Sequence, residues 1–179
     1  MIDLIKLQEF VEAWHGDQKY GDEPYKVHIA ECEAVLARFG YNDPNVRAGM
    51  KMHDVFEDHP EVTPLDVLLL FLQMRWTTAD DVLDVPAIRL AMRLSDEPGP
   101  DRKTRKKLTY PKIVEEEAAV ILKLADRIAN VERGDKLDKY KAEYPGFRKA
   151  LFRKGNSCQA MWDHLDELMG RRKPQTATA

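Results

Sequence analysis

The sequence lacks several features that mark other classes of protein. It has only two cysteines, Cys32 and Cys158, among 179 residues, which is too few for the disulfide framework of a small secreted domain. It also has no Gly-rich phosphate-binding loop, no serine-nucleophile motif and no Cys/His dyad motif. We therefore expect two reduced, packed thiols and a chemistry that uses none of these motifs.

Positive net charge and long apolar runs are missing as well. The formal net charge of −3 argues against a general nucleic-acid binder. The apolar run at residues 67–72 is too short to cross a bilayer, and the N-terminus has no signal-peptide pattern. We expect a cytoplasmic protein with one domain at residues 1–170 and a polar, disordered tail at residues 171–179.

Apolar residues recur at helical spacing along most of the chain, and no stretch alternates with a period of two. Asp43-Pro44 and Thr63-Pro64 each place a capping residue before a proline, a pattern typical of helix starts. Pro86 and Pro111 are predicted to begin two further helices, and Asn156 is predicted to cap the last one. These patterns predict an all-α, irregular helical bundle.

Four potential metal ligands stand out: His28, the adjacent pair His53 and Asp54, and Asp126. Two imidazoles and two carboxylates suit manganese, iron or another borderline divalent ion better than a metal that prefers thiolates. Asp126 is surrounded by apolar residues, where an unpaired charge is costly. A bound cation would compensate that charge, so we expect a metal site between helices.

Two further carboxylates, Glu57 and Asp58, follow His53 and Asp54 at a spacing of four residues. On a helix each such pair shares a face, which would bring Glu57 and Asp58 close to the metal. There they could orient a water molecule or take its proton. Alternatively, the His-Asp dipeptide is fortuitous and the two acids form a solvated helix end.

Three blocks of sequence together resemble a known family. They are Gly-Asp-Gln-Lys-Tyr at residues 16–20 leading to His28, His-Asp-Val-Phe-Glu-Asp at residues 53–58, and Lys-Leu-Ala-Asp-Arg at residues 123–127 followed by Asn130. Their order and spacing resemble the HD phosphohydrolase superfamily, and in particular its RelA/SpoT-type alarmone hydrolases. The blocks lie along about two-thirds of the chain.

This resemblance implies a small manganese-dependent hydrolase that removes the 3′-pyrophosphate from guanosine tetra- or pentaphosphate (ppGpp or pppGpp). The products would be GDP or GTP and pyrophosphate. It implies that Asn130 holds the ribose or a phosphate. Lys19 and Tyr25 are further candidate substrate contacts, although packing is an equal alternative for Tyr25. Lys19-Tyr20 replaces the consecutive basic residues usual at this point in the family, which affects substrate recognition rather than the metal.

A basic cluster at residues 102–107 contains five cations in six positions. Such a cluster is often a solvated face, but a polyanionic substrate would also need cations. Lys103 and Lys106 are the candidate phosphate contacts, on a loop that is expected to overhang the pocket.

Two other functions remain open. The chain could hydrolyse a different nucleotide, such as a deoxynucleoside mono- or triphosphate, or it could sense a nucleotide without cleaving it. Glu57 and Asp58 argue against a sensor, which has no need of carboxylates that handle water. In each case the expected partner is a small-molecule nucleotide, rather than a nucleic acid or a membrane. The sequence does not indicate an oligomeric state.

Overall fold

The protein is described by a computed structural model that covers residues 1–81 and 84–171. It confirms the all-α prediction, because helices and one minimal β-hairpin make up all the regular structure in these two ranges. Of the predicted tail at residues 171–179, residues 172–179 lie outside the described residues. The helices are α1 (Leu4–His15), α2 (Tyr25–Arg38), α3 (Pro44–Lys51), α4 (Val55–Asp58), α5 (Pro64–Gln73), α6 (Pro86–Leu94), α7 (Arg102–Val114), α8 (Glu117–Arg133), α9 (Leu137–Leu151) and α10 (Gln159–Leu168).

Three of the predicted helix starts are confirmed. Asp43 caps α3 through hydrogen bonds from two backbone N–H groups in the first turn. Thr63 and Asp66 form a reciprocal capping box at the start of α5, and Pro86 opens α6. In each case a proline at the first helical position loses no helical hydrogen bond.

Three other local predictions were wrong. Pro111 lies inside α7, and α8 begins at Glu117. Burial of Ile113, which is completely shielded from solvent, helps offset the hydrogen bond that a proline in a helix sacrifices. Asn156 does not cap α10, which follows Cys158 without a side-chain cap. The basic residues 102–107 form the first turns of α7 instead of a loop, because the Asp101 side chain caps that helix.

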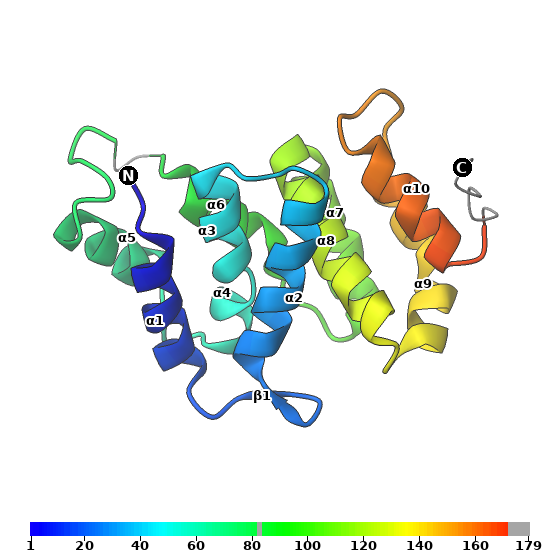
Figure 1. The fold of residues 1–179 in the computed structure, drawn as a ribbon, viewed down its shortest axis with the longest axis horizontal. Coiled ribbons are helices and arrows are strands. Elements are labelled where there is room, and N and C mark those ends of the chain that lie inside the picture. The colour runs from blue at the N-terminus through cyan, green and yellow to red at the C-terminus, as the bar shows by residue number, and fades with distance from the viewer. Residues whose placement is uncertain (82–83, 172–179) are drawn as a thin grey trace, which may run out of the picture.

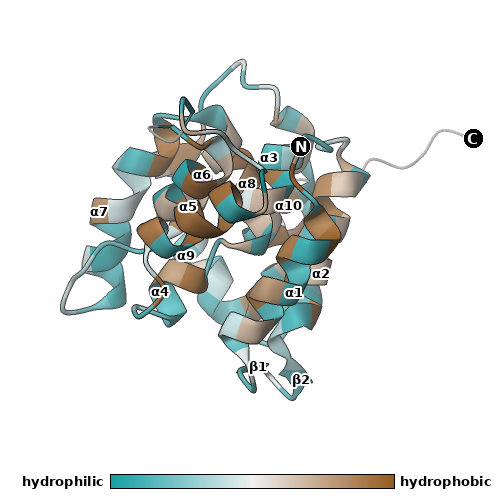
Figure 2. Ribbon diagram, turned by 90° about the vertical axis from the view of Figure 1, so that its left-hand side faces the viewer, coloured by the Kyte–Doolittle hydropathy of each residue, from teal (hydrophilic) through white to brown (hydrophobic). Residues whose placement is uncertain are grey.

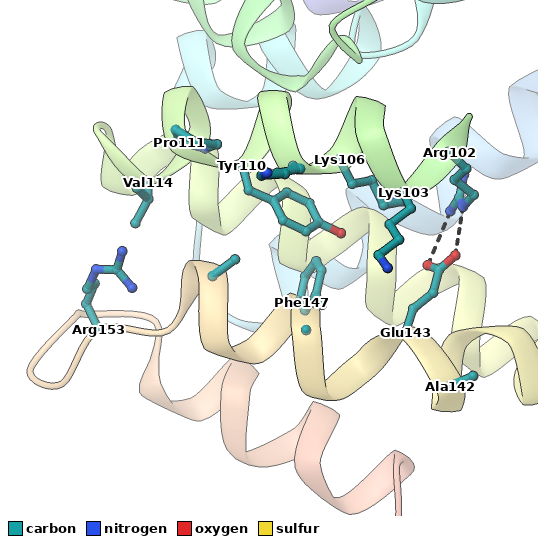
Figure 3. Close-up of a pocket in the computed structure, with 13 residues that line it drawn as sticks. Arg102, Lys103, Lys106, Tyr110, Pro111, Val114, Ala142, Glu143, Phe147 and Arg153 are labelled. Atoms are coloured by element: carbon teal, nitrogen blue, oxygen red, sulfur yellow. Dashed lines mark hydrogen bonds and ion pairs between the residues drawn. The ribbon is translucent and has the colours of Figure 1, made fainter. Parts of the chain in front are cut away.

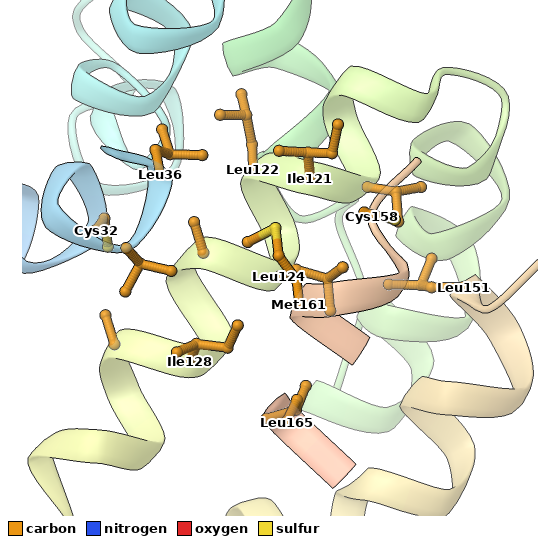
Figure 4. Packing of buried hydrophobic residues seen from close by; sticks show 14 of the residues in the cluster. Cys32, Leu36, Ile121, Leu122, Leu124, Ile128, Leu151, Cys158, Met161 and Leu165 are labelled. Carbon is orange, nitrogen blue, oxygen red and sulfur yellow. The ribbon is translucent and has the colours of Figure 1, made fainter. Parts of the chain in front are cut away.

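Helix α8 lies at the centre of the molecule, with α2 on one side and α9 and α10 on the other (Figure 1). Its buried face joins α2 and α10 in one apolar cluster (Figure 4). A second cluster joins α1, α3, α5 and α6. In Figure 2 the hydrophobic colour is concentrated on α5 and α6, whereas α7 is mostly hydrophilic. Within the described ranges no helix is both long enough and apolar enough to cross a membrane.

The β-hairpin pairs β1 (Lys19–Tyr20) with β2 (Glu23–Pro24) in antiparallel register. Its turn contains Gly21 at a positive φ of 63°, a conformation that glycine adopts without a steric penalty. The hairpin places the Tyr20 ring against His28, with 4.4 Å between the ring centroids. The hairpin therefore covers one side of the cluster of candidate metal ligands.

Candidate metal centre

The candidate metal ligands come from three separate parts of the fold. His28 lies on α2, His53 and Asp54 lie in the turn between α3 and α4, and Asp126 lies on α8. The predicted continuous helix through residues 53–58 was wrong, because α4 covers only residues 55–58. Asp54 and Asp58 still lie one turn apart, since the Asp58 N–H donates to the Asp54 carbonyl oxygen at 2.8 Å.

The histidine rings are oriented as metal ligands would be. Nδ1 of His53 lies 2.8 Å from the Met50 carbonyl oxygen, which can only accept a hydrogen bond. Nδ1 must therefore carry the proton, and a neutral His53 presents the lone pair of Nε2 to the cluster. That buried nitrogen has no hydrogen-bond partner within residues 1–81 and 84–171, although Asp54 Oδ2 lies 2.9 Å away. Nε2 of His28 lies 3.5 Å from Asp126 Oδ1.

Both candidate carboxylate ligands are held in the ionised form. Burial by itself would raise the pKa of Asp126, but Lys123 and the two histidines hold it well below the ordinary value. Burial likewise opposes ionisation of Asp54, and the His53 ring lowers its pKa. Lys123 Nζ lies 3.0 Å from Asp126 Oδ2, so part of the compensation predicted for Asp126 comes from its own helix. We did not predict this role, although Lys123 stands three residues earlier in the same apolar run.

A divalent cation fits this set of donors. The site contains two ionised carboxylates, those of Asp54 and Asp126. The buried Nε2 atom of His53 has no hydrogen-bond partner within the described ranges, and Lys123 supplies one positive charge beside Asp126. Metal ligands must be deprotonated, so an ion bound here would require the neutral imidazoles together with the carboxylates that are already ionised. Nitrogen and oxygen donors suit manganese or a similar borderline ion. The identity of the metal remains a prediction.

Cys32 belongs to the same cluster and was not predicted as a ligand. Potential ligand atoms of His28, Cys32, His53 and Asp126 all lie within 4.8 Å of one another. Cys32 follows His28 by one helical turn, a spacing that could have revealed it. Its thiol is free and buried, as predicted for a packed cysteine. Burial raises the pKa of this thiol well above its ordinary value, so it is a neutral group and a weak ligand.

Glu57 and Asp58 line the same cavity as His28, Asp54 and Asp126. Burial raises the pKa of Glu57, and the nearby charges of Asp96 and Asp54 add to the effect. A carboxylate with a raised pKa is better matched to proton transfer near neutral pH.

A second contact that we did not predict orients Asp58. Gln18 Nε2 donates to Asp58 Oδ2 at 2.7 Å. The amide oxygen of Gln18 lies 2.8 Å from His15 Nδ1 and 2.8 Å from His59 Nε2. Gln18 therefore holds the Asp58 carboxylate, and His15 and His59 position the Gln18 amide. Only the folded chain brings them together, because Gln18 and Asp58 are forty residues apart.

The remaining predicted contacts fall into two groups. Asn130 and Lys106 line the cavity with the candidate ligands, and Asn130 also donates to the Asp126 backbone oxygen at 2.8 Å. Tyr25 lies behind the cavity and donates a hydrogen bond to Asp54 Oδ2. Lys19 and Lys103 do not line this cavity. Lys19 faces a neighbouring pocket beside α1, whereas Lys103 faces a groove between α7 and α9.

The cavity has a volume of about 150 Å³ and is lined by side chains of both charges. Its acidic residues are Asp54, Glu57, Asp58, Asp96 and Asp126. Its basic residues are Arg102, Lys106, Lys123 and Arg127. Such a cavity can hold a cation on its carboxylates and a phosphate group on its basic side chains.

We expect the protein to bind a single divalent ion per chain at this centre. His28→Ala and Asp126→Asn should each remove the ion, because each variant deletes a buried donor. Cys32→Ala should keep it, since the neutral thiol contributes little. Elemental analysis of the purified proteins would measure this. Metal retained by both ligand variants, or lost from Cys32→Ala alone, would contradict the assignment.

The arrangement of helices around this centre defines the class of fold. The chain has the HD-domain fold, with a buried cluster of histidine and aspartate side chains between its helices. No protein-family model matches the sequence, and no curated protein does.

A solved structure with the same fold comes from a metazoan ortholog of SpoT, described as hydrolysing ppGpp and playing a role in starvation responses. It superimposes with a TM-score of 0.70 at 18% sequence identity, covering 94% of this chain and 96% of that one. At this identity the likeness establishes the fold.

Proposed function

We propose that this protein is a metal-dependent phosphohydrolase that removes the 3′-pyrophosphate from ppGpp and pppGpp. The products would be GDP or GTP and pyrophosphate, and the preferred metal would be manganese. The observation that carries the proposal is the cavity, which brings three of the candidate metal ligands, further carboxylates and four basic side chains together. The fold shared with a ppGpp-hydrolysing protein supports the choice of substrate.

His28, His53, Asp54 and Asp126 would hold the metal. When bound, a divalent ion in such a site supplies Lewis-acid activation of water and of a phosphate oxygen. Tyr25 keeps the Asp54 carboxylate in place through its hydroxyl group. Lys123 limits the repulsion between the carboxylates through its contact with Asp126.

Glu57 and Asp58 would manage the proton of the attacking water. Glu57 is suited to accept this proton, because burial and neighbouring acids raise its pKa. Asp58 would orient the water, since Gln18 fixes its carboxylate. Arg102 and Lys106, which line the same cavity, would bind the phosphate oxygens that become more negative as the bond breaks.

The size of the cavity limits what it can enclose. A volume of about 150 Å³ accommodates a diphosphate group rather than a whole nucleotide. The nucleoside would then lie outside it, and we place it in the pocket of about 430 Å³ beside α1, where Tyr25 donates a hydrogen bond to Asp54 of the cavity. Lys19 and Tyr25 line that pocket, which agrees with their proposed roles as substrate contacts.

The proposal can be tested with purified protein loaded with manganese and a panel of ppGpp, pppGpp, deoxynucleoside triphosphates and deoxynucleoside monophosphates. Products would be separated by anion-exchange chromatography. We expect GDP from ppGpp and GTP from pppGpp, each with one equivalent of pyrophosphate, and no turnover by Asp126→Asn. Cleavage of a deoxynucleotide alone would favour the alternative nucleotide hydrolase, and binding of ppGpp without cleavage would favour a sensor.

A further inference from the structure

A second concave surface lies between α7 and α9, outside the metal centre. This groove has a volume of about 840 Å³, within the range of pockets that bind small molecules. None of the candidate metal ligands lines it. Figure 3 shows α7 along one side and α9 along the other, with Tyr110 and Phe147 between them.

The floor of the groove is apolar and aromatic. The rings of Tyr110 and Phe147 meet edge to face, with 5.8 Å between their centroids. Val114 and Ala150 extend the floor toward the end of α7. A flat ring could pack against this floor, where aromatic contacts contribute beyond simple area burial.

The rim of the groove is strongly basic. Lys103, Lys107 and Arg153 are exposed there, and none of them forms a salt bridge with a residue in the described parts of the chain. Glu143 is the one acid in the lining, and Arg102 Nε and Arg127 Nη2 neutralise it at 2.7 and 3.2 Å. A surface of this charge is unusual in a chain whose formal net charge is −3, and it favours an anion.

We propose that the α7–α9 groove binds a small aromatic anion of the size and chemistry of a nucleoside monophosphate. Its ring would pack on Tyr110, and its phosphate would lie beside Lys103 and Lys107, which are one helical turn apart on α7, at the end of the groove away from Arg153 (Figure 3). This site contains none of the candidate metal ligands, although it shares Arg102 and Lys106 with the cavity of the metal centre, and the proposal does not depend on the substrate assigned above.

Two cations connect the groove with the metal-centre cavity. Arg102 and Lys106 line both of them. Burial lowers the pKa of Lys106 to about 8, and the charges of Lys123, Arg102 and Arg127 add to the effect. An anion in the groove therefore stabilises the charged form of Lys106 and competes with the catalytic cavity for the same two cations.

The test is isothermal titration calorimetry of the full chain, loaded with manganese, with GMP and AMP as probes. Gly146→Leu should block the groove, because a Cβ atom at this position meets nothing within 4 Å and the residue lines the groove from α9. We expect at least tenfold weaker binding of both probes by this variant and by the double variant Lys103→Glu/Lys107→Glu. Lys141→Glu is the matched control, since Lys141 is exposed on the same helix but does not line the groove.

Asp126→Asn separates the two sites, and it should bind the probes as the parent does. Binding lost from Asp126→Asn and retained by Gly146→Leu would place the probes at the metal centre and overturn the proposal. Absence of measurable binding to the parent would overturn it as well. Size-exclusion chromatography of Gly146→Leu supplies one further check, because loss of an oligomer present in the parent would identify the groove as a subunit interface instead.

Discussion

Glu57→Gln and Asp58→Asn are each expected to lower turnover of the substrate by roughly two or more orders of magnitude, in line with the loss of general acid–base catalysis. Both carboxylates line the cavity beside the candidate ligands, and in the proposed mechanism they handle the water and its proton instead of holding the metal. Metal content should therefore stay near that of the parent. Steady-state kinetics and elemental analysis of the same preparations would measure both quantities.

The controls for this prediction lie in the same segment. Asp54→Ala should lose both metal and activity, because it removes a proposed ligand. Glu61→Gln should change neither, since Glu61 is exposed three residues beyond Asp58 and does not line the cavity. Loss of metal from the Glu57 or Asp58 variants would show that these carboxylates are ligands and that the proposed roles must be exchanged.

Gly49→Val is expected to lower the free energy of unfolding by about 3 kcal/mol, at the upper end of the usual cost of overpacking a core. A Cβ atom at Gly49 would lie 2.9 Å from Leu90 Cβ and 3.3 Å from both the Ala87 carbonyl oxygen and Leu122 Cδ1. Helices α3, α6 and α8 meet at this point. A backbone oxygen and a Cβ atom cannot move aside as the end of a flexible side chain can.

Gly146→Val is the matched control for the same substitution in a helix. A Cβ atom at Gly146 meets nothing within 4 Å, so valine should change stability by less than about 0.5 kcal/mol, as is usual for surface sites. Urea unfolding followed by circular dichroism would measure the two variants. Equal stability of the two would mean that the close approach of α3 to α6 and α8 does not constrain this position.

Several features of the fold could be predicted because they depend on residues that are near neighbours in the chain. The side chain of Asp43 accepts hydrogen bonds from N–H groups two and three residues ahead, so residues close together in the chain determine where α3 begins. The same holds for the capping box of Thr63 and Asp66. Pro111 shows where this reasoning fails. Its helix-breaking tendency is local, but the buried packing of the surrounding turns of α7 outweighs it.

The sequence by itself determined the all-α class. It also predicted His28, His53, Asp54 and Asp126 as one set of metal ligands, because a buried aspartate needs a partner and these side chains suit one ion. His28, His53 and Asp126 do lie in one cluster of potential ligand atoms, and Asp54 lies beside His53. Tertiary structure decided the rest of the site. Packing of α2 against α8 added Cys32 to the cluster, and the contact between α1 and α4 brought Gln18 to Asp58. Such contacts join residues that are remote in sequence, and no local pattern encodes their distance.

The same contrast between sequence and tertiary structure applies to Lys103 and Lys106, which belong to a single basic cluster. They were equal candidates in the sequence, yet Lys106 faces both the cavity and the groove, whereas Lys103 faces the groove alone. The side chains of a helix point in directions set by its rotation, and the rotation of α7 is set by which of its residues pack against α8 and α9. The sequence therefore specified the charges, and only the packing of the helices decided which site each charge serves.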